Sequence, residues 1–156
     1  MLASNGVRVN YIEPPVPAIG AYGWIKNLVT LAGGGLVVHG GAIVHRYGLG
    51  SWQKGREVIW QQVLAALQVP VYLTIHGTGV GEPGAGRWLD EKTFVFNESV
   101  VANEEGLRQI EFVLNGLGIE MITTHSPGWV ETTNEGNWGT SHADMFLMVP
   151  DHGLAR

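Results

Sequence analysis

His142 and Asp144 stand one residue apart at the start of an apolar run, Ser-His-Ala-Asp-Met-Phe-Leu-Met-Val. Side chains two residues apart on a β-strand point to the same face, so a strand here would bring the imidazole and the carboxylate together. A histidine beside a carboxylate can act as a general acid and base, and the carboxylate can orient the imidazole or hold a cation. His142 and Asp144 are therefore candidate catalytic residues. The alternative is that both are ordinary polar groups at a strand start.

A further candidate lies in the glycine-rich stretch 77–86, Gly-Thr-Gly-Val-Gly-Glu-Pro-Gly-Ala-Gly. Its carboxylate, Glu82, could pair with a cationic substrate, or it could be a solvated loop residue. The stretch is not a phosphate-binding loop, because no Gly-Lys-Ser/Thr follows and strands rather than a helix come next. We expect its glycines to form tight turns.

The chain has no cysteine, which excludes a disulfide framework and a thiolate metal site. It also lacks the thiolate with which many enzymes attack a resonance-stabilised carbon. The histidines other than His142 do not follow a metal-binding spacing such as His-x-x-x-His, so we expect no metal and no cofactor. These histidines are His39, His45, His76, His125 and His152.

Composition and charge describe a globular chain of 156 residues that is 45% hydrophobic and 15% charged. A net charge of -5 argues against nucleic acid and anionic membranes as partners. No run reaches the ~18 apolar residues that span a bilayer, and the first residues lack the features of a signal peptide. We therefore expect a cytoplasmic location. The low share of charged residues suggests that another subunit covers part of the surface.

Hydrophobic periodicity and turn residues predict an α/β fold in which the order strand, strand, helix, strand occurs twice. Residues 1–26, which include Pro14, Pro15 and Pro17, are predicted to form an extended N-terminal arm. Residues 27–156 are predicted to form a single domain of about two and a half ββαβ units. The predicted strands are 27–32, 36–39, 42–46, 69–75, 87–90, 93–97, 119–124 and 143–149, and the predicted helices are 51–67, capped by Ser51, and 104–116, capped by Asn103.

Three stretches, in the same order, resemble motifs of the guanidino-group-modifying, or pentein, superfamily, which includes arginine deiminases, dimethylarginine dimethylaminohydrolase and amidinotransferases. Residues 77–90 are similar to the Glu-Gly-Gly-Asp loop, residues 101–106 to the Arg-Thr-Asn-x-x-Gly helix start, and residues 141–146 to the His-x-Asp strand. The resemblance implies an α/β-propeller of ββαβ units, of which this chain would hold about three of five. It also implies a guanidino substrate, with His142 as the acid–base and Glu82 and Asp144 around the cation.

The chain departs from the family pattern at three points. In this register Ala85 stands where the family has a substrate-binding aspartate, and Val101 stands where many members have an arginine. The family nucleophile is a cysteine near the end of the fold, and this chain has none.

Two hypotheses follow, and the sequence leaves open whether the chain is an enzyme. In the first, it is a pentein-like domain that is not catalytic alone and acts as an oligomeric binding or scaffold domain, with a guanidino compound as a candidate ligand. In the alternative, it is a subunit of a guanidine-modifying hydrolase or amidinotransferase whose cysteine comes from another chain. The expected partner is a second copy of the chain or a second chain that completes the propeller.

Overall fold

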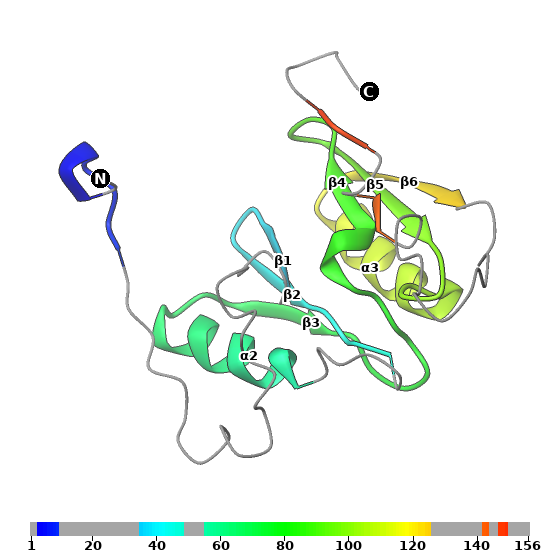
Figure 1. The fold of residues 1–156 in the computed structure, drawn as a ribbon, viewed down its shortest axis with the longest axis horizontal. Coiled ribbons are helices and arrows are strands. Elements are labelled where there is room, and N and C mark those ends of the chain that lie inside the picture. Colours follow the sequence, from blue (N-terminus) through cyan, green and yellow to red (C-terminus); the bar gives the residue numbers. More distant parts are fainter. Residues whose placement is uncertain (1–2, 10–34, 49–54, 126–141, 144–146, 150–156) are drawn as a thin grey trace, which may run out of the picture.

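The computed structural model describes residues 3–9, 35–48, 55–125, 142–143 and 147–149, and its helices and strands form two units that lie beside one another (Figure 1). Short 3-10 turns occur at Ala3–Asn5 and Pro83–Ala85. The first unit consists of β1 (Gly35–Val38), β2 (Gly41–Val44), α2 (Arg56–Ala66) and β3 (Val71–Thr74). The second consists of β4 (Gly86–Trp88), β5 (Thr93–Glu98), α3 (Glu104–Gly116) and β6 (Glu120–His125).

Each unit contains one three-stranded mixed sheet with the same strand pattern. The orders are β1-β2-β3 and β4-β5-β6, with the first pair antiparallel and the second pair parallel in both sheets. An antiparallel pair needs only a tight turn, and Gly40 supplies a positive φ of 82° between β1 and β2. A parallel neighbour needs a longer crossover, which α2 and α3 provide. The predicted mixed α/β fold is confirmed.

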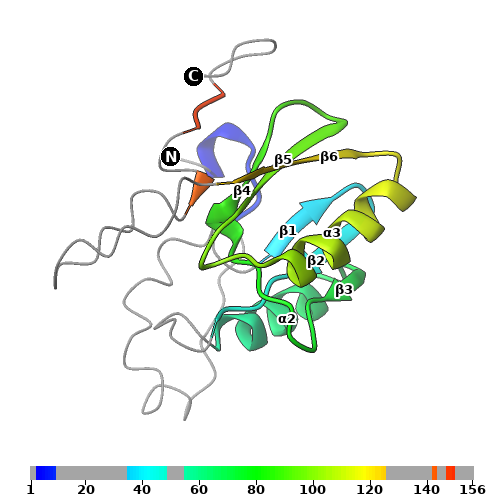
Figure 2. The same cartoon turned by 90° about the vertical axis from the view of Figure 1, so that its right-hand side faces the viewer.

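The main hydrophobic core is shared by the two units. Leu36, Val38 and Ile43 of the first sheet belong to the same buried cluster as Phe94 and Phe96 of the second. Helix α3 contacts β3 of the first sheet as well as β5 and β6 of its own, and Figure 2 shows it between them. Its buried apolar residues recur at helical spacing, as the sequence predicts: Leu107, Ile110 and Leu114.

The helix starts show where local sequence signals succeed and fail. Helix α3 begins at Glu104 with Asn103 as its N-cap, as predicted, and the Asn103 side chain accepts a hydrogen bond from the Gly106 N–H. Helix α2 begins at Arg56 rather than after Ser51, because Gly55 adopts a left-handed conformation with φ of 101° that ends the helix at that point. Residues 51–54 lie outside the described residues.

The strand predicted at 143–149 is wrong where the structure describes it. The Leu147 N–H donates to the Ala143 carbonyl over 2.7 Å, which is a helical-type turn, and Leu147 to Val149 pair with no strand. His142 is therefore not the first residue of a strand. The strand predicted at 27–32 and most of the predicted arm 1–26 fall outside the described residues, so the domain division stays a prediction. Across the described ranges, no helix is long and apolar enough to cross a bilayer.

Candidate functional site

Glu82 and His142 meet although 60 residues separate them in the sequence. The His142 Nε2 atom lies 3.2 Å from Glu82 Oε2, and the two side chains are 22% and 5% exposed. Glu82 directly precedes the 3-10 turn Pro83–Ala85, and His142 comes from the far end of the chain. The structure therefore brings together two of the three candidate residues. Asp144 lies outside the described residues, and its place in the site stays a prediction.

The contact pairs a group that can carry a proton with a nearly buried acceptor. Glu82 Oε2 can accept a hydrogen bond from the Nε2–H of a neutral imidazole, or form an ion pair with a protonated one. In both cases the carboxylate sets the orientation of the ring and fixes which nitrogen faces it. An imidazole held in this way can exchange protons with a ligand, which is general acid–base chemistry.

The backbone of Glu82 is held where three segments of the chain converge. The Gly81 N–H donates to the Arg46 carbonyl over 3.0 Å, and the Glu82 N–H donates to the Val101 carbonyl over 2.9 Å. The Glu82 carbonyl in turn accepts from the Ala85 N–H over 3.0 Å. These bonds fix the backbone on both sides of Glu82 and so limit the directions that its side chain can take.

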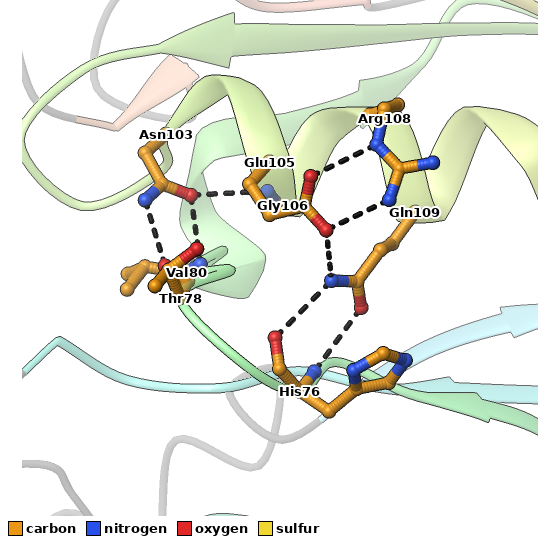
Figure 3. A network of polar contacts seen from close by, with 8 residues as sticks. All are labelled: His76, Thr78, Val80, Asn103, Glu105, Gly106, Arg108 and Gln109. Carbon is orange, nitrogen blue, oxygen red and sulfur yellow. Dashed lines mark hydrogen bonds and ion pairs between the residues drawn. The ribbon is translucent and has the colours of Figure 1, made fainter.

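Asn103 holds the glycine-rich loop and caps helix α3 with the same side chain (Figure 3). Its Oδ1 accepts from the backbone N–H groups of Val80, at 2.8 Å, and Gly106, at 3.0 Å. Its Nδ2 donates to the Thr78 carbonyl over 2.9 Å. An asparagine N-cap satisfies one helix N–H that would otherwise lack a partner, and here it also fixes the loop that leads to Glu82.

Close packing of the loop against helix α3 requires a glycine at position 106, three residues after Asn103. A Cβ at Gly106 would lie 2.0 Å from the Val80 carbonyl oxygen, far inside van der Waals contact. The loop can therefore reach the start of α3 only where residue 106 has no side chain. The Asn-x-x-Gly pattern and the glycine-rich loop, which the sequence shows as separate motifs, form one packed junction.

Gln109 makes a second connection between the loop and the helix (Figure 3). Its side-chain amide accepts from the His76 N–H and donates to the His76 carbonyl, each over 3.1 Å. It also donates to Glu105 over 2.7 Å. Hydrogen bonds from Arg108 and Gln109 lower the pKa of the exposed Glu105 carboxyl to about 2, with the Arg108 bonds as the main cause. Through Gln109, which is 5% exposed, this network joins the glycine-rich loop to helix α3.

The two positions that depart from the family pattern are interior apolar residues. Ala85 is fully buried and Val101 is 5% exposed, and both belong to the main core cluster. Neither can contact a charged substrate through a polar group. In the register of the resemblance, two charged groups are thus absent, and Glu82 and His142 remain.

His45 and Tyr47 are buried titratable residues that directly follow strand β2 and have no role in the sequence-based hypotheses. His45 is 1% exposed, and its Nδ1 lies 2.8 Å from the Gly81 carbonyl oxygen. Burial lowers the pKa of the His45 imidazole to about 4, although the bond to Gly81 acts in the opposite direction. Burial likewise raises the pKa of Tyr47 to about 12, against the nearby Arg56 guanidinium. The sequence signal for both was their alternation directly after the apolar strand β2.

The molecule also has an open cavity of about 630 Å³ that contains neither Glu82 nor His142. It lies between the first sheet and the β4–β5 turn, and it is lined by Val37, Val38, His39, Trp88, Asp90, Glu91, Lys92 and Ile119. Among the described residues, no three histidine, aspartate or glutamate side chains are grouped so that they could hold a metal ion.

Comparison with solved structures shows which known proteins this chain resembles in fold. The solved structures that match the chain include three of dimethylarginine dimethylaminohydrolase. An adduct with 4-chloro-2-hydroxymethylpyridine has a TM-score of 0.59 and 22% identity, covering 76% of this chain and 43% of the enzyme. A histidine-to-glycine variant bound to S-methyl-L-thiocitrulline has a TM-score of 0.54 and 23% identity, covering 61% and 37%. A cysteine-to-serine variant from Pseudomonas aeruginosa, complexed with citrulline, has a TM-score of 0.52 and 25% identity, covering 61% and 36%.

These matches show that the chain shares its fold with part of dimethylarginine dimethylaminohydrolase, a pentein-superfamily enzyme, which confirms the resemblance inferred from the sequence. The chain spans less than half the length of each of the three enzymes. No protein-family model and no curated protein matches it.

Proposed function

We propose that this chain is a pentein-like domain that binds a guanidino ligand at the Glu82–His142 pair and is not catalytic by itself. The observation that carries the proposal is the contact of the nearly buried Glu82 carboxylate with His142. A carboxylate removed from water is stable only with hydrogen-bond donors or a cation close by. A guanidinium is planar, weakly hydrated and carries several N–H donors, so it suits such a carboxylate better than an ammonium ion does.

The missing groups support binding rather than turnover. Attack on a guanidinium carbon needs a strong nucleophile, and this chain has no cysteine to supply one. The apolar residues Ala85 and Val101 remove charged contacts that would hold a substrate for reaction. Similarity to enzymes that were solved with citrulline and S-methyl-L-thiocitrulline supports a ligand of the same shape. Asp144, as the sequence predicts, would add a second carboxylate beside the cation.

The test is titration of the purified chain with agmatine, arginine and guanidinium chloride, followed by NMR or calorimetry. We expect Glu82→Gln to weaken binding by about 10- to 100-fold, because a hydrogen bond to a charged group is lost. Glu91→Gln is the matched control: it removes an exposed carboxylate in the separate cavity and should bind as the wild-type chain does. Equal affinities of the wild-type and Glu82→Gln chains, or no binding of any of the three ligands, would reject the proposal.

The alternative function is that of an enzyme subunit, and the Glu82–His142 contact is the observation that favours it. A histidine oriented by a carboxylate is the acid–base half of a thiol-dependent mechanism, which also needs a nucleophile. A cysteine-bearing chain that completes an α/β-propeller would supply it. The experiment is co-purification with the product of a neighbouring reading frame that contains a cysteine, followed by assay of citrulline or ammonia release. Activity of the complex that neither chain has alone would establish the alternative.

A further inference from the structure

His45 is a buried titratable residue to which the proposed function gives no part. It follows strand β2, it is 1% exposed, and its ring stacks on Phe96 with 6.0 Å between the ring centroids and 19° between the planes. Its polar contact with the rest of the described chain is the one from Nδ1 to the Gly81 carbonyl oxygen, 2.8 Å away. That carbonyl belongs to the residue directly before Glu82.

The peptide group that joins Gly81 to Glu82 is held at both of its polar ends. Its carbonyl accepts from His45, and its N–H donates to the Val101 carbonyl over 2.9 Å. Because a peptide group is planar and rigid, two bonds on its opposite sides prevent it from rotating. Rotation of this group would change the backbone torsions at Glu82 and swing its side chain away from His142.

We propose that His45 is a positioning residue that holds the Gly81–Glu82 peptide and thereby directs the Glu82 carboxylate toward His142. The proposal rests on the proposed function only in that the Glu82–His142 pair is the binding site. His45 itself touches neither the pair nor a ligand in this scheme, and it acts through the backbone alone.

The protonation state of His45 fits this role. A carbonyl oxygen only accepts, so Nδ1 carries the hydrogen and the neutral ring has none on Nε2. Burial keeps the ring neutral at physiological pH, since it lowers the pKa of His45 to about 4. The donor to Gly81 is therefore present throughout the neutral range.

A histidine at this position also has a cost that an apolar residue would not have. Nε2 is fully buried and has no hydrogen-bond partner among the described residues, which destabilises the folded state. A side chain of similar size without the orphan nitrogen would pack against Phe96 without that penalty. A residue that lowers stability while fixing a site is the expected pattern where function outweighs stability.

The experiment observes the Glu82–His142 pair directly in the full chain. Long-range proton–nitrogen NMR spectra of the ¹⁵N-labelled protein at neutral pH report the ring nitrogens of each histidine, and the His142 signals are assigned from their loss in His142→Gln. Glu82→Gln gives the reference position of the His142 signals when the carboxylate is absent. The test variants are His45→Phe, which keeps the ring but removes the donor, and His45→Asn, whose side-chain N–H₂ can take the place of Nδ1–H.

We expect the His142 signals in His45→Phe to move at least half of the way toward their position in Glu82→Gln, and those in His45→Asn to stay near the wild-type position. Rescue by asparagine separates positioning from packing, because asparagine fills the ring site less well than phenylalanine does. His142 signals unchanged in a folded His45→Phe protein would overturn the proposal. His142 signals in His45→Asn that match those of Glu82→Gln would also overturn the proposal. If His45→Phe does not fold, the comparison of His45→Asn with Glu82→Gln is the test.

The outcome is independent of whether a guanidino ligand binds. The NMR signature tests the geometry of the pair in the ligand-free chain, whereas titration with agmatine tests the proposed function. A shifted His142 signal in His45→Phe together with no agmatine binding by the wild-type chain would reject the function and leave the positioning role in place. Agmatine binding by the wild-type chain together with unchanged His142 signals in His45→Phe would support the function and reject the positioning role.

Discussion

At the scale of single residues, the candidate site depends on a carboxylate that folding has removed almost entirely from water. Glu82 is 5% exposed at its side chain, and His142 lies 3.2 Å from it. Burial of an unpaired carboxylate would cost several kcal/mol, so a donor close to Glu82 is a condition for this loop conformation. The same contact orients the imidazole. The loop conformation and the orientation of the imidazole therefore depend on one pair of atoms.

The buried His45 predicts how stability depends on pH. Its pKa in the folded chain is about 4, below the ordinary value of 6.5, so the unfolded chain binds more protons between those two values. The free energy of unfolding should therefore fall as the pH decreases from about 6.5 to about 4, by about 3 kcal/mol at most. Urea denaturation across this range measures it.

His45→Asn, which cannot titrate, should lose much less stability over the same range of pH. Glu105 contributes little to the change in stability between pH 6.5 and 4. Its pKa is lowered to about 2, so protonation of its carboxyl changes the free energy of unfolding mainly below pH 4. If the free energy of unfolding of the wild-type and His45→Asn chains depended on pH in the same way between pH 6.5 and 4, the inference that His45 is neutral in the folded chain would be wrong.

At the scale of secondary-structure elements, the site is built by the approach of the glycine-rich loop to the start of helix α3. Asn103 bonds to the loop and to the helix at once, and Gly106 leaves room for the Val80 carbonyl. The loop then continues into Gly81 and Glu82. Any change that separates the loop from α3 should therefore move Glu82 as well.

Two glycines of α3 give a matched test of this packing. Gly106→Ala should lower the free energy of unfolding by about 3 kcal/mol or more, because its Cβ would overlap the Val80 carbonyl and the loop would have to move. Gly116→Ala, in the same helix with no atom within 4 Å of its new Cβ, should leave stability unchanged or raise it by about 0.5–1 kcal/mol. Chemical denaturation measures both. Similar stabilities of the two variants would contradict the close approach.

The elements with strong local signals were predictable from the sequence. Helix α3 has an asparagine cap, two acidic residues in its first turn and an apolar stripe, and its predicted bounds are those observed. The start of α2 was misplaced because Ser51 is a good cap by type, whereas the left-handed Gly55 sets the start. The apolar run after His142 favours a strand by hydrophobicity alone, but that signal does not show whether a run is buried or paired, and Met148 in this run is 69% exposed.

The sequence predicts which residues belong to the site but not how they contact one another. Glu82 and His142 could be named from their types and from the family resemblance. Their contact could not, because it joins positions 60 residues apart through tertiary packing. His45 was missed for the same reason, since its role depends on the carbonyl of Gly81, and sequence gives no signal for a side chain that bonds a distant backbone group.

At the scale of the whole molecule, the chain shares its fold with part of dimethylarginine dimethylaminohydrolase, and its sequence contains no cysteine. We predict that the isolated chain does not hydrolyse arginine, agmatine or methylated arginines, because water alone attacks a guanidinium very slowly. Release of citrulline or ammonia from each substrate measures this. Turnover that disappears in His142→Ala would refute the prediction and require a mechanism without cysteine.

The surface suggests that the chain does not act alone. Each three-stranded sheet leaves two edge strands within the described residues, and β6 presents six residues along one of these edges. Several large apolar side chains are exposed on the same unit, among them Phe112 at 78% and Ile122 at 39%. Exposed strand edges and apolar side chains are features that proteins normally cover. We propose that another copy of the chain covers them.

Self-association should therefore appear as a mass above the 16.9 kDa of one chain in light scattering at about tens of micromolar, the range in which exposed edges associate. Ile122→Lys places a charge on the β6 edge, where natural proteins use lysine to prevent pairing, and it should shift the mass toward that of the monomer. Gln62→Lys adds the same charge to an exposed position on α2, and it should leave the mass unchanged if β6 forms the contact. A strict monomer for the wild-type chain would mean that the exposed edges and side chains have no partner in a second copy. Equal effects of the two lysines would instead assign the association to net charge rather than to the edge of β6.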